Sequence, residues 1–164
     1  MKIKEFIILN QITLHMSKLN ELKRARFPTV DIIIEKNGKI VLIKRKKEPF
    51  KDKLVLPGGH VEENETVEEA AIREAKEETS LDVKLKGILG VYSEPKRDPR
   101  YPTISTVFIA EPLNKKIKAG SDAAKAEWFE VKEIDFKELG FDHSKILKDY
   151  LKYKKKGGTY WSRR

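Results

Sequence analysis

The sequence predicts one α/β domain in which strands and helices pack as a sandwich. Three observations lead to this prediction. The 164 residues are enough for one domain with a hydrophobic core and too few for two ordinary domains. Several β-branched, apolar runs have the length of strands. Two amphipathic segments, one central and one near the C-terminus, have apolar residues at helical spacing.

The strands are expected where apolar runs lie between turn signals. Asn37 and Gly38 separate the first two runs, and Asn-Gly is the strongest short-range signal for a β-hairpin. Pro57 ends the third run, and we expect Gly58 and Gly59 after it to let the backbone turn tightly beside a helix start. The expected strands are residues 29–35, 40–44, 54–56, 83–92 and 103–110, with one more around Trp128 and Phe129.

Two helices are expected. The first begins at Glu65 and Thr66, and its buried side is formed by Val67, Ala71 and Ala75, which are small enough to pack closely on a sheet. The second runs from about 142 to 154 and starts at an aspartate that suits the N-cap. This N-cap is Asp142, and the apolar stripe is Ile146, Leu147, Tyr150 and Leu151.

Three carboxylates project from one side of the first helix. Glu74, Glu77 and Glu78 have the spacing i, i+3 and i+4, which places them within a sector of roughly 100°. Like charges at this spacing repel one another. A hard divalent cation would turn that repulsion into binding, and magnesium prefers carboxylate oxygen while keeping sites for water and phosphate. The pattern therefore indicates a phosphate-processing site; the alternative is an acidic, solvated helix face.

The wider spacing resembles the Nudix box. From Gly59, five residues lead to Glu65, and seven more lead to Arg73, which directly precedes Glu74. One fixed position departs from the signature, because Ser80 stands where the family has a glycine that ends the helix. A left-handed backbone at Ser80 would cost about 1 kcal/mol, but no metal ligand is lost.

This resemblance implies the Nudix fold, an α/β/α sandwich with a mixed central sheet, over residues 29–154. Residues 1–28 would be an N-terminal extension, either an edge strand or a segment that pairs two subunits. Residues 155–164 would be a basic C-terminal tail. The family often works as a homodimer, so a homodimer is expected.

The resemblance also assigns roles within the box. Glu74, Glu77 and Glu78 would bind Mg²⁺, with Mn²⁺ as a substitute, and the Gly58 carbonyl would complete the coordination. Metal-bound hydroxide would then attack a diphosphate. The box glycine is Gly59. An ion pair between Arg73 and Glu65 would support the ligands, because an arginine fork holds one geometry better than a lysine.

The general base is left open. It is either a box glutamate, Glu77 or Glu78, or an acid from a loop near the last strand. Asp122 is the candidate for the second option, although an ordinary turn aspartate explains it as well. Glu127 is a weaker alternative.

The loop after the fourth expected strand bears on the substrate. It resembles the loop of Nudix enzymes that cleave ADP-ribose, whose sign is a proline about fifteen residues beyond the box; here Pro95 follows Leu81 by fourteen positions. Pro95 would stiffen the loop, and Arg97 and Arg100 would grip phosphate bidentately. The alternative is a charged surface turn. Arg45 faces either the phosphates or the solvent.

Composition narrows the class of protein. The net charge of +9 invites a nucleic-acid interpretation, but residues 59–81 hold eight acidic and two basic residues, so the excess lies outside them. An acidic pocket in a basic surround attracts an anionic substrate. No aromatic platform for nucleic acid is visible, so nucleic-acid binding is not expected. The chain has no cysteine, which excludes disulfides, thiolate nucleophiles and cysteine-bound zinc.

Other features are expected to carry no chemistry. His15, His60 and His143 lack ligand spacing and are interpreted as incidental. The apolar run at residues 6–9 is too short for a signal peptide, and no segment could span a membrane. A cytoplasmic location is expected.

These observations and the resemblance predict a magnesium-dependent hydrolase that splits ADP-ribose into AMP and ribose 5-phosphate. The adenine of the substrate is expected to stack on an aromatic residue from a neighbouring subunit. Two alternatives stay open: a nucleoside triphosphate pyrophosphatase that clears modified nucleotides, and a non-catalytic nucleotide sensor or RNA-binding protein of the same fold.

Overall fold

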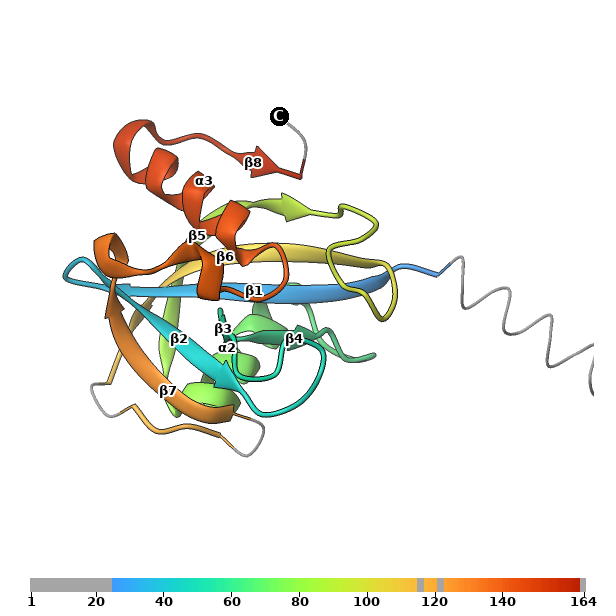
Figure 1. Cartoon of the computed structure of the whole chain (residues 1–164), viewed down its shortest axis with the longest axis horizontal. Coiled ribbons are helices and arrows are strands. Elements are labelled where there is room, and N and C mark those ends of the chain that lie inside the picture. The colour runs from blue at the N-terminus through green and yellow to red at the C-terminus, as the bar shows by residue number, and fades with distance from the viewer. Residues whose placement is uncertain (1–24, 115–116, 121–122, 163–164) are drawn as a thin grey trace, which may run out of the picture.

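The computed structural model describes residues 25–114, 117–120 and 123–162. Two α-helices cover opposite faces of a mixed sheet (Figure 1). Helix α2 (Val67–Thr79) lies on one face and helix α3 (His143–Lys156) on the other. This arrangement confirms the predicted α/β/α sandwich. Most of the expected N-terminal extension and Asp122 lie outside the described residues. Within these residues, neither helix has the length and hydrophobicity of a membrane span.

The sheet has eight strands in the described part of the chain, in the order β3-β2-β1-β6-β5-β8, with β4 paired to β1 and β7 paired to β2. The central strands β1 and β6 run parallel, and β1 forms antiparallel pairs with β2 and β4. The mixed sheet therefore matches the prediction. The bounds are β1 Phe27–Lys36, β2 Lys39–Arg45, β3 Leu54–Val55, β4 Gly58–His60, β5 Val83–Tyr92, β6 Thr103–Pro112, β7 Ala123–Glu130 and β8 Tyr160–Trp161.

The predicted hairpin is present. Strands β1 and β2 pair antiparallel with Glu35 opposite Ile40. Between them Asn37 and Gly38 have φ angles of 51° and 79°. Two consecutive positive φ values are typical of the type I′ turn, whose twist matches that of the strands it joins.

The two faces of the sheet form two hydrophobic clusters. Along β1, Val30, Ile32 and Ile34 pack in the cluster that includes α2, whereas Ile33 packs in the cluster that includes α3. This alternation follows from the two-residue period of a strand. Helix α2 contributes small residues, which let it lie close to the sheet; these are Ala70, Ala71 and Ala75.

The segment after Pro57 differs from the expectation of a tight turn. Gly58–His60 is the short strand β4, paired antiparallel with β1. Neither Gly58 nor Gly59 has a positive φ. The reason for glycine is space, because a Cβ atom at Gly58 would lie 2.2 Å from the carbonyl oxygen of Val30.

The ends of α2 combine a regular cap with a strained one. Thr66 is the N-cap and forms a capping box with Glu69. At the other end Ser80 has φ 61° and ψ 14°, the left-handed conformation considered from the sequence. The Ser80 hydroxyl donates a hydrogen bond to the carbonyl of Lys118 at 3.2 Å, which ties this end of the helix to a neighbouring loop.

The C-terminal region is folded further than expected. Helix α3 extends to Lys156, and β8 follows it, paired parallel with β5. Tyr160 packs in the core cluster. Gly90 of β5 makes this approach feasible, since a Cβ atom there would lie 1.9 Å from the carbonyl oxygen of Tyr160. Of the expected tail, the first two residues belong to α3, and Tyr160 and Trp161 form a strand that docks on β5.

Candidate active site

A cavity of about 460 Å³ lies where α2, β1, β2 and the loop between β5 and β6 meet. Both acidic and basic side chains line it. Carboxylates of Glu62, Glu74 and Glu78 line the side next to α2. The basic residues that line it are Arg45, Lys46, Lys47, Arg73, Arg97 and Arg100.

The three helix glutamates have different surroundings. Glu74 and Glu78 line the cavity, and the Glu74 side chain is 13% exposed. Glu78 accepts a hydrogen bond from the backbone N–H of Gly58 at 2.9 Å. Burial raises the pKa of Glu78 to about 8, and the nearby Glu74 adds to this effect. Glu77 is 59% exposed and lies outside the residues that line the cavity.

The supporting ion pair expected between Arg73 and Glu65 is present. Arg73 donates to the two Glu65 oxygens at 2.6 and 3.0 Å. These hydrogen bonds lower the pKa of Glu65 to about 2. The same guanidinium reaches Glu74 at 2.9 Å and the carbonyl of His60 at 3.0 Å. Arg73 thus fixes Glu74 relative to the segment that carries Gly59.

The donor chemistry fits a hard divalent cation. The carboxylates of Glu74, Glu77 and Glu78 and the backbone around Gly58 offer oxygen ligands. Glu74 and Glu78 are carboxylates with raised pKa values because burial disfavours their charge, and a cation would offset that cost. Among the described residues, however, no three acidic or histidine side chains are gathered closely enough to hold a metal ion.

A buried polar network forms the floor of the cavity. Asp31 of β1 accepts hydrogen bonds from Ser105 at 2.6 Å and from Arg97 at 2.9 Å. Arg97 also binds Asp142 at 2.8 Å. Burial raises the pKa of Asp31, but His143 and Arg97 outweigh this effect and hold the pKa well below its usual range. The network therefore joins β1, β6, α3 and the loop between β5 and β6.

His143 belongs to this network, so its interpretation as incidental is wrong. Its Nδ1 accepts the backbone N–H of Leu56 at 2.9 Å. Nε2 therefore carries the ring proton, and it lies 3.2 Å from Asp31 Oδ1. One feature of the sequence indicates this buried network. Asp31 interrupts an apolar strand, and a carboxylate buried there needs a hydrogen-bonding or charged partner.

Arg97 differs from the expectation of an arginine that grips phosphate. Its side chain is only 5% exposed. Its guanidinium donates to Asp31, Asp142 and Thr103. Asp142 lies at the N-cap of α3 as predicted, but its carboxylate accepts from Arg97 instead of capping the helix. Arg97 lines the cavity as part of its floor and anchors the loop.

The other predicted residues lie in three places. Arg100 lines the cavity and is held by Asp98 at 2.7 Å. Arg45 also lines it, and its Nε donates to the carbonyl of Pro49 at 2.8 Å. Pro95 instead borders a separate hollow beside Tyr101. Glu127 lies in β7 and pairs with Lys125 outside the cavity lining.

Comparison with known proteins assigns the family. The family model described as NUDIX domain matches residues 25–150. The chain belongs to the Nudix family. A Methanocaldococcus jannaschii protein named ADP-ribose pyrophosphatase is 52% identical over 142 residues, covering 84% of this chain and 83% of that protein. Human diphosphoinositol polyphosphate phosphohydrolase 3-alpha is 32% identical and covers 76% of this chain and 74% of its own length.

Solved structures agree with the Nudix assignment. A Nudix hydrolase from Nitrosomonas europaea has a TM-score of 0.76 at 27% identity, covering 84% of this chain and 77% of that one. A bifunctional NMN adenylyltransferase/ADP ribose pyrophosphatase from Francisella tularensis has a TM-score of 0.70 at 29% identity, and covers 91% of this chain but 47% of its own. The predicted family and fold are confirmed.

Proposed function

We propose that this Nudix protein hydrolyses the diphosphate of ADP-ribose to AMP and ribose 5-phosphate. The observation that carries the proposal is the cavity with carboxylates beside α2 and basic side chains around it. Such a site can hold a cation and an anionic diphosphate together. The choice of ADP-ribose is supported by the name of the Methanocaldococcus jannaschii relative, which is 52% identical to this chain.

The box residues would hold the metal. Glu74, Glu77 and Glu78, with the Gly58 carbonyl, would bind Mg²⁺ or Mn²⁺, which when bound neutralises the diphosphate and lowers the pKa of a water ligand. Arg73 and Glu65 keep Glu74 in place through their paired hydrogen bonds.

The reaction adds water across the diphosphate. An oxygen from water forms a bond to one phosphorus, and the bond from that phosphorus to the bridging oxygen breaks. The two products leave as phosphate monoesters. A carboxylate must take the proton of the attacking water. Glu78 or Glu77 is proposed for this role, with Asp122 as the alternative outside the described residues.

A substrate panel tests this function. Purified protein with magnesium should release AMP from ADP-ribose faster than it cleaves any nucleoside triphosphate. Glu77→Gln and Glu78→Gln should each remove most turnover, whereas Glu68→Gln on the exposed side of the same helix should leave it unchanged. Faster cleavage of triphosphates would favour the alternative pyrophosphatase. Full activity of either box variant would disprove the metal assignment.

A further inference from the structure

A row of apolar side chains crosses four strands of the sheet. Pro28 of β1 lies opposite Ile104 of β6. Val91 of β5 lies opposite Trp161 of β8 on one side. On its other side Val91 lies opposite Thr106, two positions after Ile104 in β6. Paired residues, and residues two apart in a strand, point to the same face of a sheet. We call Pro28, Ile104, Val91 and Trp161 the apolar row.

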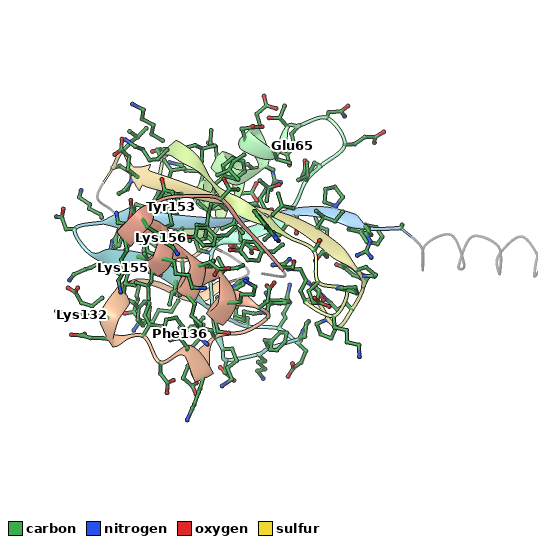
Figure 2. All side chains as sticks on the ribbon, turned by 90° about the horizontal axis from the view of Figure 1, so that it is seen from above. Glu65, Lys132, Phe136, Tyr153, Lys155 and Lys156 are labelled. Atoms are coloured by element: carbon green, nitrogen blue, oxygen red, sulfur yellow. The ribbon has the colours of Figure 1, made fainter. Side chains whose placement is uncertain are left out.

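The apolar row lies on the α2 side of the sheet, at a place that this helix does not fully cover. Phe108, four positions after Ile104 in β6, is buried in the cluster that includes α2. Ile104 faces the same way, but it is 36% exposed. Figure 2 looks onto the opposite face, which α3 covers and where Tyr153 and Lys156 of this helix are labelled. Helix α2 therefore shields Phe108 and leaves the end of the sheet at the apolar row exposed.

The members of the row are exposed next to one another. Val91 is 42% exposed and Trp161 is 45% exposed. A single exposed apolar side chain is normal on a protein surface. Here the side chains stand on adjacent strands, which lie about 4.8 Å apart, so they adjoin. A continuous apolar patch of this kind marks a place where another segment or molecule binds, and the row therefore favours an apolar binding partner.

The described chain begins beside the apolar row. Strand β1 starts at Phe27, whose backbone N–H donates to the carbonyl of Pro102 at 3.0 Å. The next residue, Pro28, is a member of the row. Figure 1 shows this start of β1 at the same end of the sheet as the loop between β5 and β6. Residues 1–24, which lie outside the described part of the chain, are thus joined to the fold next to the row.

The sequence of residues 1–24 divides into an apolar part and a polar part. Residues 3–14 are rich in large apolar side chains, and residues 15–24 are richer in polar and charged ones. Ten residues span up to roughly 33 Å, whereas the row crosses three gaps between strands, a distance of roughly 15 Å. Residues 15–24 are therefore long enough to place the apolar part on any member of the row. The large apolar residues of this part are Ile3, Phe6, Ile7, Ile8, Leu9, Ile12 and Leu14.

We infer that residues 3–14 dock on the apolar row of their own chain. The tether keeps this segment at a high effective concentration near the row, which favours docking within one chain over docking on a second copy. Docking removes apolar surface of the segment and of the row from water. It also covers the ends of β5 and β6, between which the loop with Arg97 and Arg100 lies. The inference goes beyond the proposed function and does not depend on it.

Hydrogen exchange of the full chain, followed by mass spectrometry, tests this docking. In the unmutated protein, the backbone amides of residues 3–14 should exchange at least about tenfold more slowly than in a free peptide of the same sequence. Val91→Lys and Ile104→Lys each place a charge in the row and should restore the free rate. Leu113→Lys is the matched control and should leave the protection intact, because Leu113 is also exposed and apolar but lies at the opposite end of β6. The melting temperature of each variant verifies that it is folded.

Three results would overturn the inference. One is exchange of residues 3–14 at the free rate in the unmutated protein, a measurement that needs no variant. Another is full protection in both row variants, because the segment would then be ordered elsewhere. The third is protection that falls on dilution, together with a change in sedimentation from dimer to monomer, because the row would then be covered by a second copy of the chain.

Discussion

The carboxylate of Glu74 occupies the space that a side chain on Gly59 would need. A Cβ atom at Gly59 would lie 2.1 Å from Glu74 Oε1, well below van der Waals contact. The glycine and the glutamate of the Nudix box are therefore coupled by contact between β4 and α2. The neighbouring Gly58 is constrained by backbone instead, because its Cβ would lie 2.2 Å from the Val30 carbonyl oxygen.

This difference predicts that substitution of Gly59 mainly lowers turnover, whereas substitution of Gly58 mainly lowers stability. Gly59→Ala should displace the Glu74 side chain and lower kcat by roughly 10- to 100-fold, with little effect on thermal stability, because a side chain can rotate away. Gly58→Ala should instead lower the melting temperature strongly, since the backbone of β1 cannot yield. Gly87→Ala is the control, because a Cβ there meets nothing within 4 Å among the described residues. Full turnover by Gly59→Ala would show that the position of Glu74 is not critical.

Arg73→Lys should weaken the metal site without unfolding the protein. Lysine keeps the charge but cannot bind both oxygens of Glu65 and also reach Glu74. The magnesium concentration for half-maximal activity should rise about tenfold. Lys76→Arg, the opposite exchange on an exposed position of α2, should have no such effect. An unchanged magnesium requirement for Arg73→Lys would contradict the positioning role of the fork.

Arg97 and Arg100 should respond differently to the same exchange. Arg97→Met removes the guanidinium that pairs with both Asp31 and Asp142 and should lower the free energy of unfolding by roughly 3–5 kcal/mol. Arg100→Met removes a half-exposed side chain and should raise KM while stability changes by less than about 1 kcal/mol. Urea denaturation and steady-state kinetics measure both. A stable Arg97→Met protein with a raised KM would instead support the phosphate-binding role expected from the sequence.

Asp149 should make stability depend on acid pH. Burial raises the pKa of this carboxylate, but hydrogen bonds from Lys145 and Lys152 outweigh burial and lower it. A lowered pKa in the folded state adds stability above the unfolded value of 3.8, and this stability is lost as the pH falls through the folded pKa. Asp149→Asn should cost roughly 1–3 kcal/mol at pH 7.

The same cost should shrink as the pH falls from the unfolded value toward the lower folded pKa, because the unfolded aspartate takes up a proton first and the native carboxylate follows only at lower pH. Asp135→Asn, the same exchange at an exposed turn, is the matched control. A stability difference between Asp149→Asn and the parent protein that is constant from neutral to acid pH would contradict this account.

Local patterns predicted most of the secondary structure. Asn37 and Gly38 specify a hairpin because two positive φ values are costly for most other residues. The spacing of Glu74, Glu77 and Glu78 places them on one side of α2 because helical geometry is fixed by 3.6 residues per turn. Their pattern with Gly59, Glu65 and Arg73 was enough to recognise the Nudix family.

What the sequence alone determined about this protein is its family, its sandwich of strands and helices, and the acidic helix, since these depend on residues close together in the chain. Only the tertiary structure decided which distant residues meet. It buried Arg97 between Asp31 and Asp142, and it placed Phe141 beside Arg45 in the cavity. The physical reason is that contacts between residues far apart in sequence are set by sheet pairing and helix packing, which local periodicity does not specify.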